Sequence, residues 1–148
     1  MTGFTLDTGA LIALERGERR VTALLNHALA MPEAVLHVPA AVLAQAFRGG
    51  PRQARLARLL GLPQIKIVPL DTATAQVVGL LLGARGGEDV VDACVVVCAR
   101  RYRQPVVTGD RHDLQRLDPK LLLEVIRPPP RWLDRRASGI VPADCLPA

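Results

Sequence analysis

The chain has few aromatic residues, few cysteines and no long apolar segment. Aromatics make up 3% of its 148 residues, so Leu, Val and Ala must fill any core. Cys94, Cys98 and Cys145 are odd in number and give no disulfide framework, which fits a reducing compartment. Cys94 and Cys98 lie one helical turn apart and could share a metal, but without a CxxC motif or a nearby His we favour two small buried side chains.

The sequence also lacks the signals of export and of membrane insertion. The segment MTGFTLDTGALIAL has no basic region ahead of an apolar one and carries Asp7 within its apolar stretch. The longest uncharged apolar run, around residues 77–84, is far shorter than the roughly 20 residues that span a bilayer. We therefore expect a soluble, cytoplasmic protein that does not associate with membranes.

Hydrophobic residues, at 49% against 22% charged, are sufficient for one folded domain. The net charge of +5 and pI near 9.9 make a polyanionic partner plausible. Of the 19 basic residues only Lys66 and Lys120 are lysine, a bias that GC-rich coding DNA would explain equally well. Arg52, Arg55 and Arg58 would form a basic stripe on a helix, which either contacts phosphates or is simply a solvated face.

Short β-branched runs alternate with longer helical segments, a pattern typical of a parallel sheet flanked by helices. The predicted strands are Phe4–Leu6, Val35–Val38, Ile65–Leu70, Val106–Thr108 and Leu123–Ile126. The predicted helices are Thr8–Arg16, Arg20–Met31, Ala40–Arg48, Pro51–Leu60, Ala73–Arg85, Val91–Arg101 and Arg111–Leu117. We predict one α/β domain over residues 1–127 and a proline-rich tail over residues 128–148.

Four acidic residues lie where such a fold would gather them. Asp7 directly follows the first strand, and Asp110 follows the fourth after one glycine. Asp113 comes one helical turn later, and Asp92 begins an almost wholly apolar helix, where a charge is costly unless something compensates it. Carboxylate clusters of this kind suit Mg²⁺ or Mn²⁺, and the matching chemistry is metal-assisted hydrolysis of a phosphodiester.

Each acid also has a purely structural explanation. Asp7 would serve as the N-cap of the helix that follows it, as we expect of Asp71. The sequence TGDRHD around Asp110 favours a turn, Asp92 could belong to a helix cap next to Asp89, and Asp113 would be an ordinary surface acid.

Three segments, FTLDTGALIAL, VVDACVVVCARR and PVVTGDRHDL, together resemble the ordered acidic signatures of PIN domains, most closely the ribonuclease toxins of VapBC-type toxin–antitoxin pairs. The resemblance implies a PIN-like three-layer sandwich with a central five-stranded sheet in the order 3-2-1-4-5. It implies Mg²⁺- or Mn²⁺-dependent cleavage of RNA, a homodimer, and inhibition by a cognate antitoxin. By position, Asp7 and Asp92 would be metal ligands, Asp110 a further ligand, directly or through water, and Asp113 a supporting acid. Thr8 and Thr108 would be hydroxyls that line the site.

Gln45 departs from the family pattern. The segment VPAAVLAQAFR resembles the second signature, in which Gln45 takes the place of a glutamate. Glutamine keeps an oxygen ligand but removes a negative charge, which should weaken metal binding. Glu15 and Asp89 are possible local substitutes. The alternative function is therefore a weakly active or inactive domain that binds RNA or antitoxin.

Two other enzyme classes share the first motif. Asp7-Thr8-Gly9-Ala10 matches the local motif of aspartic proteases, but this chain has one copy and strong helical segments. A haloacid-dehalogenase-like phosphatase would need a second aspartate at the position of Gly9. We set both aside.

Overall fold

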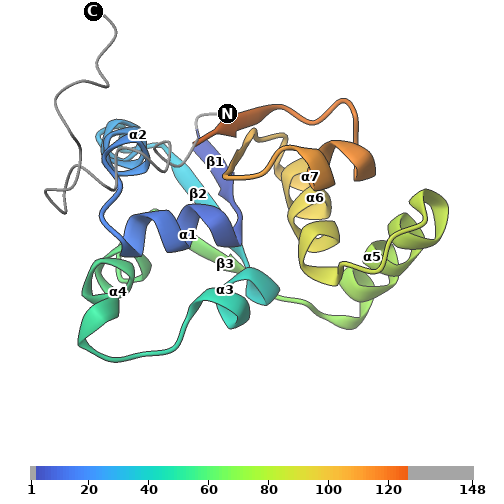
Figure 1. The fold of residues 1–148 in the computed structure, drawn as a ribbon, viewed down its shortest axis with the longest axis horizontal. Coiled ribbons are helices and arrows are strands. Elements are labelled where there is room, and N and C mark those ends of the chain that lie inside the picture. The colour runs from blue at the N-terminus through green and yellow to red at the C-terminus, as the bar shows by residue number, and fades with distance from the viewer. Residues whose placement is uncertain (1–2, 127–148) are drawn as a thin grey trace, which may run out of the picture.

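The computed structural model describes residues 3–126 as one parallel sheet between two layers of helices (Figure 1). The strand order is β3-β2-β1-β4-β5, and every neighbouring pair is parallel. The strands are β1 (Gly3–Leu6), β2 (Val35–Pro39), β3 (Ile65–Val68), β4 (Val106–Thr108) and β5 (Leu123–Val125). The predicted α/β class and strand order are confirmed, whereas the predicted tail, with Cys145, lies outside the described residues.

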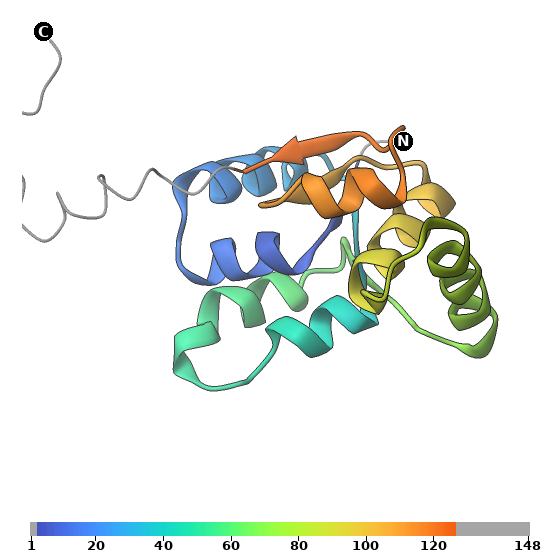
Figure 2. The ribbon, with the colours of Figure 1, turned by 45° about the vertical axis from the view of Figure 1, so that its right-hand side comes forward.

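The helices connect these strands and cover both faces of the sheet. They are α1 (Thr8–Glu15), α2 (Arg19–Leu29), α3 (Ala40–Ala46), the 3-10 turn η1 (Pro51–Gln53), α4 (Ala54–Leu60), α5 (Thr72–Arg85), α6 (Val90–Tyr102) and α7 (His112–Leu117). Helix α6 packs against β1 and β2, and α5 and α7 pack against α6 (Figure 2). On the other side α1 packs against α2 and α4, while α3 reaches both α1 and α6.

Several predicted boundaries differ from the structure by one or a few residues, and three of them differ for local reasons. The strand predicted to end at Leu70 ends at Val68, immediately before Pro69, whose ring leaves no N–H for strand pairing. The helix predicted from Pro51 begins as a 3-10 turn and becomes α-helical at Ala54. Helix α3 ends at Ala46 because the next residue, Phe47, is extended at φ −79° and ψ 128°.

The core lies on both sides of the sheet and is almost entirely aliphatic. Leu6, Leu36, Val38 and Val106 from the strands are fully buried, as are Val95 and Val96 of α6. This confirms that Leu, Val and Ala fill the interior. Among residues 3–126, none of the helices combines the length and apolar character needed to cross a membrane.

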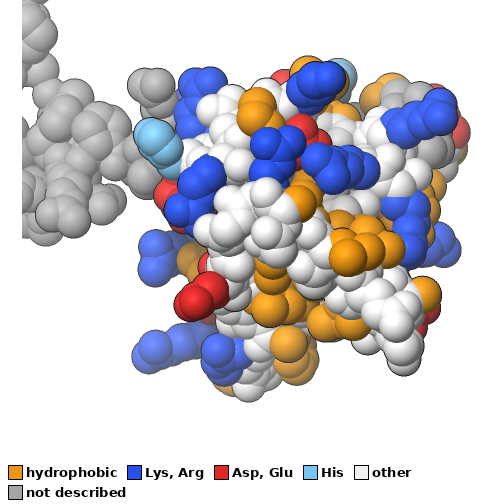
Figure 3. All heavy atoms as spheres, turned by 90° about the vertical axis from the view of Figure 1, so that its right-hand side faces the viewer, with side chains coloured by type: hydrophobic (Ala, Val, Ile, Leu, Met, Phe, Trp, Pro, Cys, Tyr) orange, Lys and Arg blue, Asp and Glu red, His pale blue; other side chains and the backbone are white. Residues whose placement is uncertain are grey.

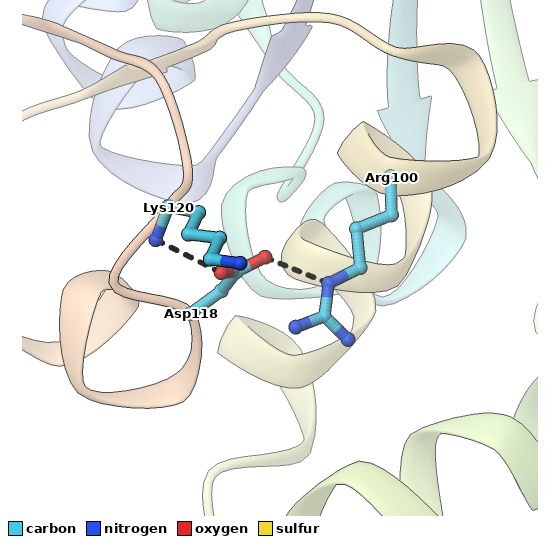
Figure 4. A network of polar contacts seen from close by, with 3 residues as sticks. All are labelled: Arg100, Asp118 and Lys120. Atoms are coloured by element: carbon cyan, nitrogen blue, oxygen red, sulfur yellow. Dashed lines mark hydrogen bonds and ion pairs between the residues drawn. The ribbon is translucent and has the colours of Figure 1, made fainter.

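An ion pair joins α6 to the loop after α7. Arg100 Nε donates to Asp118 Oδ2 at 2.7 Å, and the Lys120 backbone N–H donates to Asp118 Oδ1 at 3.0 Å (Figure 4). Burial opposes ionisation of Asp118, but the Arg100 and Lys120 hydrogen bonds outweigh it, so the pKa of Asp118 is lowered. The contact fixes the chain just before β5 at the edge of the sheet.

Candidate active site

Strands β1 and β4 end side by side, and this brings the first and third acidic segments together. The parallel pairing matches Thr5 with Val106 and Leu6 with Val107. The next residues along the two strands are Asp7 and Thr108, at the carboxyl edge of the sheet. In open α/β sheets this edge is where ligands bind.

Asp7 is a buried carboxylate that also caps a helix. Its Oδ1 accepts a 2.7 Å hydrogen bond from the Ala10 backbone N–H at the start of α1, as the capping interpretation expected. The side chain is only 9% exposed. Burial raises the pKa of Asp7. Hydrogen bonds from the Thr108 side chain and from the amides of Ala10 and Gly9 offset only part of this rise, and the charge of Asp110 raises the pKa further. Capping therefore holds the carboxylate in place without satisfying its charge.

Asp110 lies in a turn that Thr108 organises. The fully buried Thr108 hydroxyl donates to the Asp110 carbonyl at 2.7 Å and accepts from the Asp110 N–H at 3.0 Å. Asp110 Oδ1 accepts from the backbone N–H of His112, the first residue of α7, at 2.9 Å. This hydrogen bond stabilises the turn before α7. The turn predicted from TGDRHD is present, and it leaves Asp110 exposed beside Asp7.

Asp92 lies in the first turn of α6, where the actual N-cap is Asp89. The Asp89 Oδ1 accepts from the Asp92 N–H at 2.9 Å. Burial, first of all, and then the charges of Asp89, Asp113, Asp7 and Asp110, in that order, together raise the pKa of Asp92 to about 6. All four predicted acids, together with Asp89, are therefore close enough for their charges to interact.

Gln45 reaches the same region from α3. Its Oε1 accepts a 2.5 Å hydrogen bond from the hydroxyl of Thr8, the residue after Asp7. Gln45 is thus linked through Thr8 to the segment that carries Asp7. Glu15 lies at the far end of α1, where its Oε2 accepts from Gln53 Nε2 at 3.2 Å. Glu15 therefore does not substitute for the glutamate that Gln45 replaces. Asp89 does lie next to Asp92, where its charge raises the pKa of that carboxyl.

The donor set fits a hard divalent cation that keeps part of its water shell. Within residues 3–126 no group of three or more Asp, Glu, His or Cys side chains is arranged so that it could hold a metal ion by itself. Mg²⁺ typically binds through one or two carboxylates and retains several waters. Asp7 is buried and Asp92 half-buried, both have a raised pKa, and within residues 3–126 neither forms an ion pair, so both are ligands of the type that such a cation prefers.

Gly9 is a feature of the site that the sequence motifs did not single out. A Cβ at Gly9 would lie 3.3 Å from Asp7 Oδ1 and 3.3 Å from the Gly109 backbone nitrogen. The start of α1 and the β4–α7 turn therefore approach each other with little room for a side chain. No charge or periodicity marks this position, since the contact forms only when the two segments meet across the sheet.

Comparison with protein families identifies the fold and its relatives. The PIN domain family matches residues 4–119. A search of curated proteins finds no match. The structure is similar to VapBC2 from Rickettsia felis bound to a promoter DNA fragment, at 18% identity and a TM-score of 0.62, with 84% of this chain and 98% of that chain covered.

Two further solved structures are similar. One is a toxin–antitoxin complex from Klebsiella pneumoniae, at 20% identity and a TM-score of 0.57, covering 74% of this chain and 88% of that chain. The other is FitAcB from Neisseria gonorrhoeae, at 20% identity and a TM-score of 0.54, covering 81% and 95% respectively. At these identities the likeness establishes the fold.

Proposed function

Because the chain belongs to the PIN domain family, we propose that it is a Mg²⁺- or Mn²⁺-dependent ribonuclease that hydrolyses RNA phosphodiester bonds. The observation that carries this proposal is that Asp7, Asp92, Asp110 and Asp113 lie close enough for their charges to interact at one edge of the sheet, where burial first and then these charges raise the pKa of Asp92 to about 6. Carboxylates that repel one another are stabilised by a shared cation. We further propose that residues 1–127 form the nuclease domain.

The proposed roles follow from how each side chain is held. Asp7 and Asp92 would bind the cation directly, Asp110 directly or through water, and Asp113 would support them. A bound divalent ion lowers the pKa of its water and offsets charge that develops on the phosphate. Asp7 is oriented by the Ala10 amide, and Thr108 fixes the turn that presents Asp110. Thr8 orients Gln45 by donating to its side-chain oxygen. Because these hydrogen bonds exist in the protein alone, Asp7 and Asp110 are in position before the substrate binds.

We propose that the protein is the toxin of a type II toxin–antitoxin pair, acts in the cytoplasm and is inhibited by a cognate antitoxin. The toxin–antitoxin complexes among its structural neighbours support an antitoxin partner. A homodimer is supported by an apolar face on α5, where Val77 is 47% and Leu80 is 74% exposed. Figure 3 looks onto this side of the molecule and shows hydrophobic side chains gathered there between basic ones.

The test is cleavage of a structured RNA by the purified protein, freed of any bound partner, in Mn²⁺ or in EDTA. We expect cleavage in Mn²⁺, none in EDTA, and none by Asp7→Asn in either. This substitution keeps an oxygen that can cap α1 but removes the charge that binds the cation. Absence of cleavage in Mn²⁺, or equal cleavage by Asp7→Asn, refutes the nuclease proposal.

Gln45 supports a second candidate, a weakly active or inactive domain that binds RNA or antitoxin. The glutamine adjoins the carboxylate cluster through Thr8 and contributes no charge to it. This candidate predicts that the protein binds RNA but leaves it intact in Mn²⁺. The same cleavage assay, run beside a binding assay, distinguishes the two.

A further inference from the structure

A polar pocket opens between α1, α3 and η1, and Gln45, which is hydrogen-bonded to Thr8, is one of its lining residues. Its volume is about 350 Å³. The polar residues that line it are Arg16, Arg48, Arg52, Glu15, Gln45 and Gln53. Three arginines and one glutamate thus line the pocket, so it carries an excess of positive charge.

The wall of this pocket is built around the buried Gln53 side chain, which is 4% exposed. Its Oε1 accepts from the backbone N–H groups of Arg48 and Gly49 at 2.8 and 2.9 Å. Its Nε2 donates to the Ala46 carbonyl at 2.8 Å and to Glu15 Oε2 at 3.2 Å. One side chain therefore fixes the turn after α3 and also engages the only acid of the pocket.

The three arginines keep donors available for an anion. Among the described residues the one ion pair joins Arg100 to Asp118, so Arg16, Arg48 and Arg52 pair with no carboxylate there. Arg48 Nη1 donates to the carbonyls of Ala44 and Phe47, at 3.1 and 2.8 Å, which holds its guanidinium at the end of α3. A guanidinium has five N–H donors, and its planar fork matches the oxygens of a phosphate.

The structure divides the basic stripe that the sequence suggested. Arg52 faces this pocket, but Arg55 donates to the Glu15 carbonyl at 3.3 Å and lies against Gly17. Arg58 lines a different groove with Leu14 and Leu25. The functional grouping is therefore Arg52 with Arg16 and Arg48, which come from other segments.

Gln45 joins the pocket to the proposed catalytic site. It lines the pocket and accepts from Thr8, which follows Asp7. Arg16 caps the other end of α1, about 12 Å along the helix axis from Thr8 at 1.5 Å per residue. A glutamate at position 45 would place a negative charge between the pocket and the carboxylates, whereas the neutral glutamine does not repel a polyanion there.

We propose that this pocket binds a backbone phosphate of the RNA substrate other than the one that is cleaved. The inference rests on the proposed ribonuclease function and adds to it a second anchoring point for the substrate. Arg16, Arg48 and Arg52 hold the phosphate, while the neutral Gln45 lets the RNA strand pass from the pocket to the carboxylates.

The test measures binding of a fluorescent single-stranded RNA in EDTA at several salt concentrations. The test variant is Arg48→Gln/Arg52→Gln, and the matched control is Arg58→Gln on the same side of the molecule. Loss of one phosphate contact should reduce the slope of log K against log salt by about 0.7. Affinity should fall about fivefold at moderate salt, the effect of about 1 kcal/mol. Arg58→Gln should change neither quantity.

Two further variants separate charge from structure. Arg48→Lys/Arg52→Lys keeps the charge and should retain the salt slope. Gln45→Glu should weaken RNA binding in EDTA, since it adds a negative charge at the passage. Unchanged RNA binding by Arg48→Gln/Arg52→Gln, or an equal loss in Arg58→Gln, overturns the inference.

The outcome is distinguishable from failure of the proposed function. If the native protein binds RNA with the predicted arginine dependence but does not cleave it in Mn²⁺, the pocket stands and the nuclease proposal falls. If it cleaves RNA in Mn²⁺ while Arg48→Gln/Arg52→Gln binds normally, the nuclease stands and the pocket belongs to another partner.

Discussion

Asp92 is destabilised as a carboxylate in the folded protein. It lies half-buried in the first turn of α6, next to the apolar residues from Ala93 onward, and the charges of Asp89 and Asp113 are nearby. Its N–H is bonded to Asp89, but no basic side chain neutralises it among the described residues. The sequence shows that Asp92 precedes a run of apolar residues, whereas its proximity to the other acids depends on the fold.

The raised pKa predicts a specific dependence of stability on pH in EDTA. With a pKa of about 6 in the folded state against 3.8 for the free side chain, the folded protein binds more protons between these values. The contribution of Asp92 to the free energy of unfolding should therefore fall as pH rises from about 4 to about 6. Urea unfolding at a series of pH values should show this decline in the native protein and a smaller one in Asp92→Asn. Identical profiles would contradict the assignment.

Gln45 offers a direct test of the missing negative charge. Gln45→Glu should tighten Mn²⁺ binding about fivefold in calorimetry, since one more charge near the ion is worth ~1 kcal/mol in water. Gln76→Glu, an equal change of charge on the exposed surface of α5, is the control and should have no effect. Unchanged affinity for Gln45→Glu would place this residue outside the reach of the bound ion.

Among the elements, α5 shows how completely local signals can define a helix. Asp71 was predicted as its N-cap, and its Oδ1 accepts from the Thr74 N–H at 2.8 Å. The helix was predicted to end at Arg85, and the next residue, Gly86, adopts the left-handed conformation at φ 70° and ψ 51° while its N–H donates to the Leu82 carbonyl. Both ends follow from the residue types alone.

Two glycines of α5 should respond to alanine in opposite ways. Gly86→Ala should destabilise the protein by about 1 kcal/mol, because a side chain is strained in the left-handed region. Gly83→Ala should stabilise it by about 0.5–1 kcal/mol, because Gly83 is helical and a Cβ there meets no atom within 4 Å. Thermal unfolding of both variants measures this contrast. Equal shifts in the melting temperature would show that the left-handed conformation at position 86 does not require glycine.

Contacts between distant elements were not predictable from one sequence. His37 of β2 stacks on Tyr102 of α6 with ring centroids 3.6 Å apart, and its Nδ1 bonds to Gln104 Oε1 at 2.8 Å. Gln104 Nε2 also donates to the Val35 carbonyl at 2.9 Å. Each of these residues is an isolated polar or aromatic position in the chain, so no local sequence pattern indicates that they contact one another beside β2.

For the whole molecule, the alternation of elements predicted the fold class, and the family resemblance supplied the strand order. The parallel sheet arose from short β-branched runs separated by well-capped helices, which is why its existence was clear from the residues. The polar pocket beside the site was not predictable, because Arg16, Arg48 and Arg52 come from different segments. The stripe counted along the sequence groups Arg52 with Arg55 and Arg58, whereas in the structure Arg52 lines the pocket with Arg16 and Arg48.

The apolar face of α5 predicts how copies of the chain associate. Leu80→Glu should shift the protein from dimer to monomer in sedimentation velocity, because a buried unpaired charge opposes association. Leu122→Glu is a matched control, since Leu122 is 71% exposed in the loop before β5, against 74% for Leu80. A native protein that sediments as a monomer, or equal effects of both variants, would contradict a dimer through α5.

The most direct test of the central claim is the cleavage of a structured RNA by the native protein and Asp92→Asn, with analysis of the product ends. Metal-assisted hydrolysis uses water as the nucleophile, so the products should carry no 2′,3′-cyclic phosphate. We predict cleavage by the native protein only with Mn²⁺ or Mg²⁺, and a rate at least about 100-fold lower for Asp92→Asn. Cleavage that persists in EDTA, or an Asp92→Asn rate equal to that of the native protein, would contradict the account.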